Sequence, residues 1–422
     1  MNENPDLTDL PSQKWMEGQI QYMKDLTKNV KKLNDALELL ASQPEVEVGQ
    51  TPAEVIWEGD LAELLHFKQE NVEQKPPVLL VYALINEEYI LDLQPGRSVV
   101  ESLLNEGLDV YMINWYKPDK RHRFETLNDY VNYFMDVCVD KVRKKRNRDS
   151  INILGYCMGG TMSSMYAALY PEKVKSLTLM AAGLDFEEDE GLLSHWANSD
   201  YFDPEKVVEA FGTCPGDFLD GAYLALAPVN NTVGKLLNLA DNAEDEEFVK
   251  MFFRMEKWIH DSKDIPGPAF SKFVGDLYQK NKLIKNEFHI GGEHVDINNI
   301  TMPLLTIIGE YDTLVPPESS LPFKDKVPSE KTKVMKAPVG HIGLSVSSKV
   351  HPDLWGKAAE WIKEHDRIPL KSIKGIGEKT AEKLKEASVK DGTDLKRADT
   401  EELSEKTGIS ENRIEKWKKR AE

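Results

Sequence analysis

Cysteine is scarce in this sequence: Cys138, Cys157 and Cys214 are the only three in 422 residues. Three scattered cysteines cannot form the set of paired disulfides that stabilises small secreted domains, and their spacing does not match a zinc site. We therefore expect a reduced, cytoplasmic protein without a metal, in which a free thiolate can persist.

Long hydrophobic runs are also missing. No stretch approaches the roughly 20 apolar residues of a transmembrane helix, and the first residues, MNENPDLTDLPSQKW, are polar and acidic, unlike a secretory signal. The formal net charge of −19 argues against nucleic acid as the partner of the chain as a whole. No transmembrane segment is expected.

The first 48 residues are predicted to form an N-terminal helical arm. Between residues 12 and 42, apolar side chains recur every three to five positions, which indicates a helix with a one-sided apolar stripe. The segment QPEVEVGQTP then ends the helix. The stripe fits both an arm packed on the rest of the chain and a helix that binds a partner.

From Pro76 onward the pattern changes to alternating strands and helices. Apolar runs such as PPVLLVYALI and LDVYMINW indicate buried strands, and SVVESLLNEG is a helical segment between them. This alternation is typical of a parallel sheet with right-handed crossovers. It stops between residues 185 and 300, where helices and loops rich in aromatic residues replace it, and resumes at MPLLTIIGEYD.

The stretch NILGYCMGGTMSS, residues 152–164, places a cysteine at the junction of a predicted strand and a predicted helix. Gly155 and Gly159 lack the Cβ atoms that would collide in so sharp a turn, so the Cys157 side chain is exposed at the C-terminal edge of the sheet. The helix N-terminus stabilises a thiolate and offers backbone N–H donors to an oxyanion. We expect the first donor from Met158 and the second from the loop around Ile85.

Two further residues complete a candidate catalytic set. Asp312 follows a strand in the segment IIGEYDTLVPP, and His341 lies in the glycine-flanked loop of APVGHIGL. Nucleophile, acid and histidine therefore occur in the chain order of α/β-hydrolases. Taken singly, each has an ordinary structural explanation, because a buried cysteine usually acts as a small hydrophobic residue. Cys138 is predicted to lie in the core and Cys214 in a loop of the insertion.

These patterns predict an α/β-hydrolase fold with a cap insertion, plus a small all-α C-terminal domain. The predicted boundaries are 1–48 for the arm, 49–184 and 301–366 for the hydrolase core, 185–300 for the cap and 367–422 for the C-terminal domain.

The segment LDLQPGRSVV is interpreted as structural. Ser98 is predicted to cap a helix after the Pro95-Gly96 turn. We also expect Asp92 and Arg97 to pair and to hold this loop near the oxyanion site.

At these residues the sequence resembles the catalytic subunit of polyhydroxyalkanoate synthases, and most of all the short class III or class IV subunit. The motifs that carry the resemblance are YALINEEYILDLQPGRS (82–98), GLDVYMINW (107–115), GYCMGGT (155–161), GEYDTLVPPESS (309–320) and GHIG (340–343). Thr313 departs from the family, in which a histidine commonly follows the aspartate, and the C-terminal extension is a second departure.

The resemblance implies polymerisation of (R)-3-hydroxyacyl-CoA into polyhydroxyalkanoate with release of coenzyme A. Cys157 would be the acylated nucleophile and His341 the base that activates its thiol. Asp312 would either support His341 or activate the hydroxyl of the incoming monomer. Coenzyme A is a leaving group of the substrate, and no cofactor is implied.

The resemblance also implies a homodimer, a second small synthase subunit, or both, and association with polyhydroxyalkanoate granules. The N-terminal arm is a candidate contact. Two other functions stay open: a cysteine-type thioesterase or hydrolase of the same fold, and a non-catalytic scaffold in which the arm and the tail bind partners.

The C-terminal tail contains LKSIKGIGEKTAEKLKEA, which matches a helix-hairpin-helix pattern, followed by a degenerate second copy with helix-cap signals at Thr400 and Ser410. Gly375 and Gly377 would let the hairpin backbone approach a phosphate. With 14 basic and 12 acidic residues from Ile368 to Glu422, the tail is nearly neutral. Weak DNA contact stays open, and protein contact is favoured.

Overall fold

The computed structural model describes residues 11–42, 45–68, 75–187 and 191–421. The chain forms two compact units. One combines the residues up to Glu47 with Asp217–Asp261, and the other contains Val48–Gly216 and Ser262–Glu422.

The larger unit is built on an eight-stranded sheet, with strand order β1-β2-β6-β3-β7-β8-β13-β14. The pairings from β6 to β14 are parallel, whereas β1 pairs with β2 and β2 with β6 in antiparallel fashion. The central strands are buried on both faces, which is why they read as continuous apolar runs. The strands are β1 (Ala53–Glu58), β2 (Ala62–Phe67), β3 (Pro77–Val81), β6 (Asp109–Trp115), β7 (Ile151–Tyr156), β8 (Val174–Met180), β13 (Leu304–Gly309) and β14 (Thr332–Ala337).

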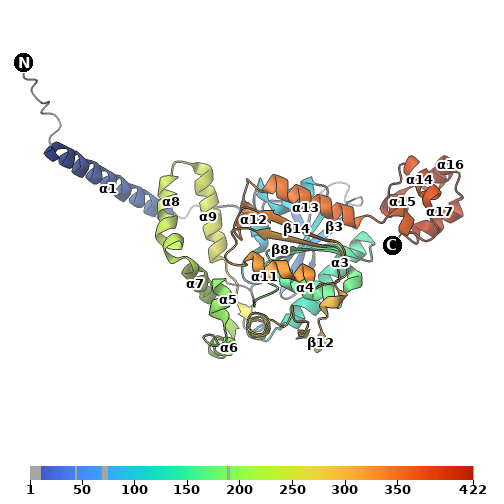
Figure 1. The fold of residues 1–422 in the computed structure, drawn as a ribbon, viewed down its shortest axis with the longest axis horizontal. Helices are drawn as coiled ribbons and strands as arrows, with labels where there is room; N and C mark the ends of the chain where they lie inside the picture. Colours follow the sequence, from blue (N-terminus) through green and yellow to red (C-terminus); the bar gives the residue numbers. More distant parts are fainter. Residues whose placement is uncertain (1–10, 43–44, 69–74, 188–190, 422) are drawn as a thin grey trace, which may run out of the picture. The chain divides into compact units, whose positions relative to one another are not determined.

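Helices cover both faces of this sheet, as Figure 1 shows for α13 on one side and α4 on the other. Ser98 caps α2 as predicted, because its hydroxyl accepts a hydrogen bond of 2.9 Å from the Glu101 backbone N–H. The flanking helices are α2 (Val99–Asn105), α3 (Asp136–Arg146), α4 (Met158–Leu169), α11 (Pro317–Ser320), α12 (Gly343–Val346) and α13 (His351–Asp366).

Strands β1 and β2 precede the point where the sequence pattern was expected to begin, at Pro76. In β2, buried and partly buried residues alternate over its first four positions, and β1 carries a register shift between Val55 and Trp57. These two antiparallel strands, of which only β1 lies at the edge of the sheet, lack the continuous apolar run of the parallel strands, and the sequence pattern therefore did not predict them.

The insertion between residues 185 and 300 is divided between the two units. The larger unit keeps its two ends, which meet where β9 (Thr213–Cys214) pairs with β10 (Ile265–Pro266). The remaining elements of the insertion that lie in this unit are α5 (Leu192–Ala197), α6 (Pro204–Phe211), α10 (Gly267–Lys272), η7 (Phe273–Tyr278), β11 (His289–Ile290), β12 (Glu293–His294) and η8 (Ile297–Asn299). Helix α7 (Gly216–Leu226) begins where the chain passes to the smaller unit.

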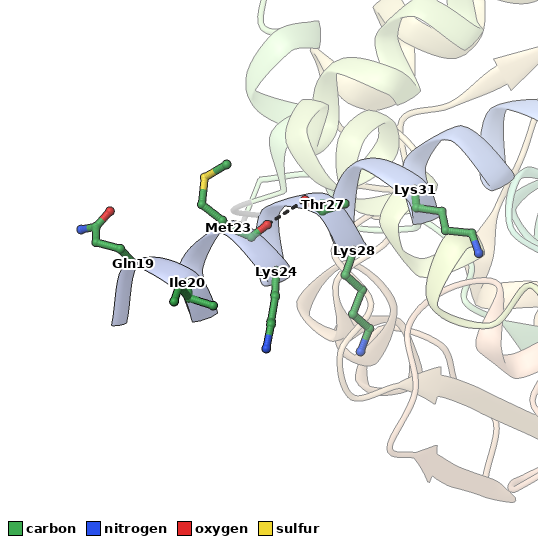
Figure 2. Close-up of a pocket in the computed structure, with 7 residues that line it drawn as sticks. All are labelled: Gln19, Ile20, Met23, Lys24, Thr27, Lys28 and Lys31. Carbon is green, nitrogen blue, oxygen red and sulfur yellow. Dashed lines mark hydrogen bonds between the residues drawn. The ribbon is translucent and has the colours of Figure 1, made fainter. Parts of the chain in front are cut away.

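The smaller unit packs the C-terminal end of α1 (Pro11–Ser42) on α8 (Lys235–Asp241) and α9 (Glu246–His260). Its core holds Ala36 together with Phe252 and Phe253. Nearer the N-terminus of α1, apolar side chains are exposed, including Met23 at 56% and Val30 at 61%. Figure 2 shows Ile20 and Met23 on this part of the helix, with Lys24 and Lys28 extending beside them.

The C-terminal tail forms α14 (Glu378–Glu386), α15 (Gly392–Arg397), α16 (Thr400–Thr407) and α17 (Glu411–Lys418) around a core of its own. Gly375 in the first hairpin adopts a φ of +103°, a left-handed conformation that favours glycine. The prediction of Thr400 as a cap is wrong by one residue, since the Asp399 side chain accepts from the Glu402 N–H. Ser410 holds the N-cap position of α17 without a side-chain bond to the helix.

Among the described residues, no helix combines the length and the apolar character needed to cross a membrane. The same residues contain no group of three or more His, Cys, Asp or Glu side chains that could hold a metal ion.

Candidate active site

Cys157 lies at a strained turn between β7 and α4. Its backbone has a φ of +56° and a ψ of −129°, a conformation that non-glycine residues rarely adopt. A Cβ atom on Gly155 would lie 2.5 Å from the Cα of Gly160, and one on Gly159 would lie 2.2 Å from the Val81 carbonyl oxygen. The two glycines are thus required by close backbone approach, and the turn presents a partly exposed thiol.

Asp312 and His341 come together at the same edge of the sheet. Asp312 follows β13, and its Oδ2 lies 2.7 Å from Nδ1 of His341. Its other oxygen accepts backbone N–H bonds from Leu314 and Val315, at 3.0 and 2.9 Å. The carboxylate is therefore fixed, and it holds the His341 ring so that Nε2 is the nitrogen left for another partner.

That partner is Cys157, whose sulfur hydrogen-bonds to His341. Burial of the imidazole opposes its protonation. The Cys157 thiolate charge and the hydrogen bonds to Asp312 and Cys157 outweigh burial, and together they raise the pKa of His341 to about 10. The three predicted residues thus form a contiguous Cys–His–Asp arrangement.

Tyr156 is a residue of the site that the sequence did not single out. Its hydroxyl donates to the His341 carbonyl at 3.1 Å, and the two rings stack with centroids 5.1 Å apart. Burial raises the pKa of Tyr156 well above its usual value. Tyr156 therefore fixes the histidine loop as a neutral donor, a role that its position before the nucleophile does not reveal.

The two predicted oxyanion donors lie on neighbouring segments. Met158 is the first residue of α4, so its backbone N–H has no acceptor four residues earlier within the helix. Ile85 lies in the loop after β3, and the start of that loop abuts α4 at Gly159, where a Cβ atom would lie 2.6 Å from the Tyr82 carbonyl oxygen. Their role as donors stays a prediction.

The expected pair between Asp92 and Arg97 is wrong. Asp92 accepts instead from the Ser98 hydroxyl at 2.6 Å and from the Thr51 hydroxyl at 2.7 Å. Arg97 donates to the Val346 carbonyl at 3.0 Å, on the segment that follows His341. The short distance in sequence between two opposite charges indicated an ion pair. Instead, the Asp92 carboxylate accepts from hydroxyl groups, and the Arg97 guanidinium donates to a carbonyl distant in sequence.

The other two cysteines are fully buried. Burial raises the pKa of the Cys138 thiol, and burial together with the nearby Asp264 charge raises the pKa of Cys214 to about 12. Both thiols are therefore inert compared with a thiolate.

The sheet, the strained turn and the Cys–His–Asp arrangement define an enzyme of the α/β-hydrolase class. The model of the family described as alpha/beta hydrolase fold matches residues 76–347. The Poly-beta-hydroxybutyrate polymerase (PhaC) N-terminus matches residues 5–103, and the SAM-like helix-hairpin-helix tandem matches residues 368–422.

Curated relatives specify the family further. The chain is 41% identical to the poly(3-hydroxyalkanoate) polymerase subunit PhaC of Haloarcula marismortui, over 96% of each chain. It is 51% identical to the corresponding subunit of Haloferax mediterranei, over 76% of this chain and 65% of that one. With that of Allochromatium vinosum it shares 37% identity over 79% of this chain and 94% of the relative. The chain belongs to the poly(3-hydroxyalkanoate) polymerase family, which confirms the resemblance and the predicted fold class.

Proposed function

We propose that this chain polymerises (R)-3-hydroxyacyl-CoA through a covalent acyl-Cys157 intermediate and releases coenzyme A. One observation above all supports this proposal. The Cys157 side chain at the strained turn is hydrogen-bonded to His341, and Nδ1 of His341 lies 2.7 Å from Oδ2 of Asp312. Sequence similarity gives the reaction class, and this arrangement supplies the groups that the chemistry requires.

A thiol nucleophile suits a thioester substrate. When Cys157 attacks the acyl carbon of a hydroxyacyl-CoA, one carbon–sulfur bond forms and another breaks, so little free energy is lost. The acyl group stays activated for the next transfer, whereas an oxyester on serine would lie lower in free energy. A thiolate is also a strong nucleophile near neutral pH.

Chain growth needs one group that donates a proton in a first step and accepts one in a second step. In the first, the Cys157 thiolate takes the acyl group, and protonated His341 gives its proton to the departing CoA thiolate. In the second, the 3-hydroxyl of another hydroxyacyl-CoA attacks the acyl carbon, its proton passes to His341, and the Cys157 thiolate leaves. Cys157 then takes the lengthened chain from that CoA, so one CoA is released per monomer added.

The charge state of His341 fits both steps. In the free enzyme the thiolate charge helps to keep the imidazole protonated. Acylation removes that charge, and burial then favours the neutral ring, which can act as a base toward the hydroxyl. Because Asp312 already accepts from His341 and from two backbone N–H groups, we assign it to holding the ring rather than to contacting the monomer.

Replacing Cys157 with alanine is expected to lower the pKa of His341, because it removes the thiolate charge and one hydrogen bond. Nuclear magnetic resonance titration of labelled histidines in the wild type and in Cys157→Ala measures this. His351, whose pKa burial already lowers, is the internal reference and should not move. A His341 midpoint that stays near 10 in the variant would contradict the assignment.

The raised pKa of His341 also predicts that the free energy of unfolding depends on pH. Because the pKa of His341 is raised above its ordinary value of 6.5, its stabilising contribution is complete below about pH 6.5. It is lost as the pH rises through about 10.

The experiment that tests the proposed function measures both products. Incubation with 3-hydroxybutyryl-CoA should release CoA together with polymer that is insoluble in water. Release of CoA with only free hydroxy acid would instead identify a thioesterase, and absence of both would leave the scaffold hypothesis.

We further propose that the exposed stripe of α1 contacts a second copy of the chain or a small second subunit. Its support is the exposure of Met23 and Val30 on a helix whose other end is packed. Val30→Asp is expected to weaken association measured by sedimentation velocity, because it places a charge in an apolar contact. Lys24→Gln, on the adjacent polar side, should not (Figure 2). Equal association of both variants would contradict the proposed contact through the exposed stripe.

We also propose that the protein associates with polyester granules.

A further inference from the structure

The loop that carries Ile85 is hydrogen-bonded to the residues with which the chain returns from the smaller unit. The chain leaves the larger unit after Gly216 and re-enters it at Ser262. The first two residues after this return bond to the loop. The Asn86 amide donates to the Ser262 hydroxyl at 2.9 Å, and the Lys263 backbone N–H donates to the Ile85 carbonyl at 2.6 Å.

The Lys263 side chain extends these contacts. It is only 2% exposed, and its Nζ lies 2.6 Å from Glu87 Oε2 and 3.5 Å from Glu88 Oε2. The same ammonium donates to the Trp115 carbonyl at the end of β6. A single buried cation thus joins two consecutive carboxylates of the loop to the neighbouring strand.

Burying this cluster is costly unless every charge is compensated. Burial raises the pKa of Glu88 to about 7, and the Lys263 charge opposes that rise. Glu88 Oε2 accepts no hydrogen bond within the described structure, so its nearby ammonium is the group that compensates it. Without Lys263, the charge of Glu87 would act on the buried Glu88 with no ammonium to oppose it.

The loop is held on its other side as well. The Trp115 indole N–H donates to the Tyr82 carbonyl at 3.0 Å. Residues 82 and 85 are thereby both fixed, and the peptide that carries the Ile85 N–H lies between them.

We propose that Lys263 is a positioning residue for acyl transfer at Cys157. Its buried ammonium and its backbone N–H fix the loop of residues 82–88, so that the Ile85 N–H faces the oxygen of the acyl group. This rests on the proposed function, in which that N–H stabilises the oxyanion. Loss of one oxyanion donor typically costs about 10²- to 10³-fold in rate.

The test compares two reactions of the same thiol in Lys263→Met. Acyl transfer, followed as CoA release, needs the oxyanion site, whereas alkylation of Cys157 by iodoacetamide does not. We expect the kcat for CoA release to fall about 100-fold with little change in KM, while the alkylation rate stays within about twofold of the wild type. Lys263→Arg, which keeps the charge, should recover part of the loss.

Lys173→Met is the matched control. Lys173 also pairs with two carboxylates, Asp136 at 2.5 Å and Asp140 at 3.1 Å, but these lie on α3, away from the loop. CoA release by this variant should match the wild type.

Three results would overturn the proposal. These are CoA release by Lys263→Met within about threefold of the wild type, an equal fall in CoA release and alkylation, or an equal loss in Lys173→Met. If Lys263→Met does not fold, the triple variant Lys263→Met, Glu87→Gln, Glu88→Gln removes the unpaired charges, and the same comparison is read from it. Failure of the proposed function is distinguished by the wild type itself, which would then react with iodoacetamide but form no polymer.

Discussion

Cys157→Ala is expected to abolish CoA release from 3-hydroxybutyryl-CoA, with a loss of at least about 10³-fold. Alanine leaves no atom to accept the acyl group, and the rest of the site cannot replace a covalent step. Cys157→Ser should retain no more than a trace of activity, because the oxyester would lie lower in free energy than the thioester. The measurement is the initial rate of thiol release, with polymer determined in parallel.

The other cysteines supply the control for that experiment. Cys138 and Cys214 are fully buried, and burial raises the pKa of both thiols. A single equivalent of iodoacetamide should therefore label Cys157 alone and stop CoA release in the wild type. Full activity of Cys157→Ala, or of the labelled wild type, would disprove the acyl-Cys157 intermediate.

The parts of the site that could be predicted from sequence are those fixed by local backbone geometry. A nucleophile between Gly155 and Gly159 needs only a strand, a turn and a helix, and all three leave clear patterns. Asp312 and His341 were found through chain order, because parallel strands end at one edge of a sheet. Each of these signals depends on neighbours in sequence or on the regular topology of the fold.

The parts that could not be predicted depend on contacts between distant segments. Tyr156 bonds to a carbonyl at residue 341, and Lys263 bonds to a carbonyl at residue 85. Nothing in the composition around Lys263 distinguishes it from a solvated lysine. The predicted Asp92–Arg97 pair is wrong for the same reason. Asp92 accepts from the Thr51 hydroxyl, and Arg97 donates to the Val346 carbonyl.

What separates a polymerase from a hydrolase is also not local to the nucleophile. In the proposed mechanism the acyl-enzyme must react with a hydroxyl more often than with water, which requires a site that excludes solvent. The insertion between residues 185 and 300 is rich in aromatic residues, which suit such a role. Phe252, Phe253 and Trp258 are buried, but Tyr201 and Phe211 are 73% and 64% exposed. Only part of the aromatic content of the insertion therefore packs inside the units.

Gly159→Ala is expected to remove activity and to destabilise the larger unit by roughly 3 kcal/mol or more. The added methyl group would lie 2.2 Å from the Val81 carbonyl oxygen and 2.6 Å from that of Tyr82. Backbone atoms cannot turn aside as a flexible side chain can, so α4 and the end of β3 must separate. That movement displaces the Met158 N–H, the Ile85 loop and the Cys157 thiol together.

Gly275→Ala tests whether this effect belongs to the turn. Gly275 also lies in a helical segment of the larger unit, but a Cβ atom there would meet nothing within 4 Å. Alanine at this position should leave CoA release unchanged and should not lower stability, because it replaces glycine in a helix. Thermal unfolding and CoA release are measured for both variants. If Gly159→Ala stays active and as stable as Gly275→Ala, the close packing of α4 on β3 does not fix the geometry of the nucleophile.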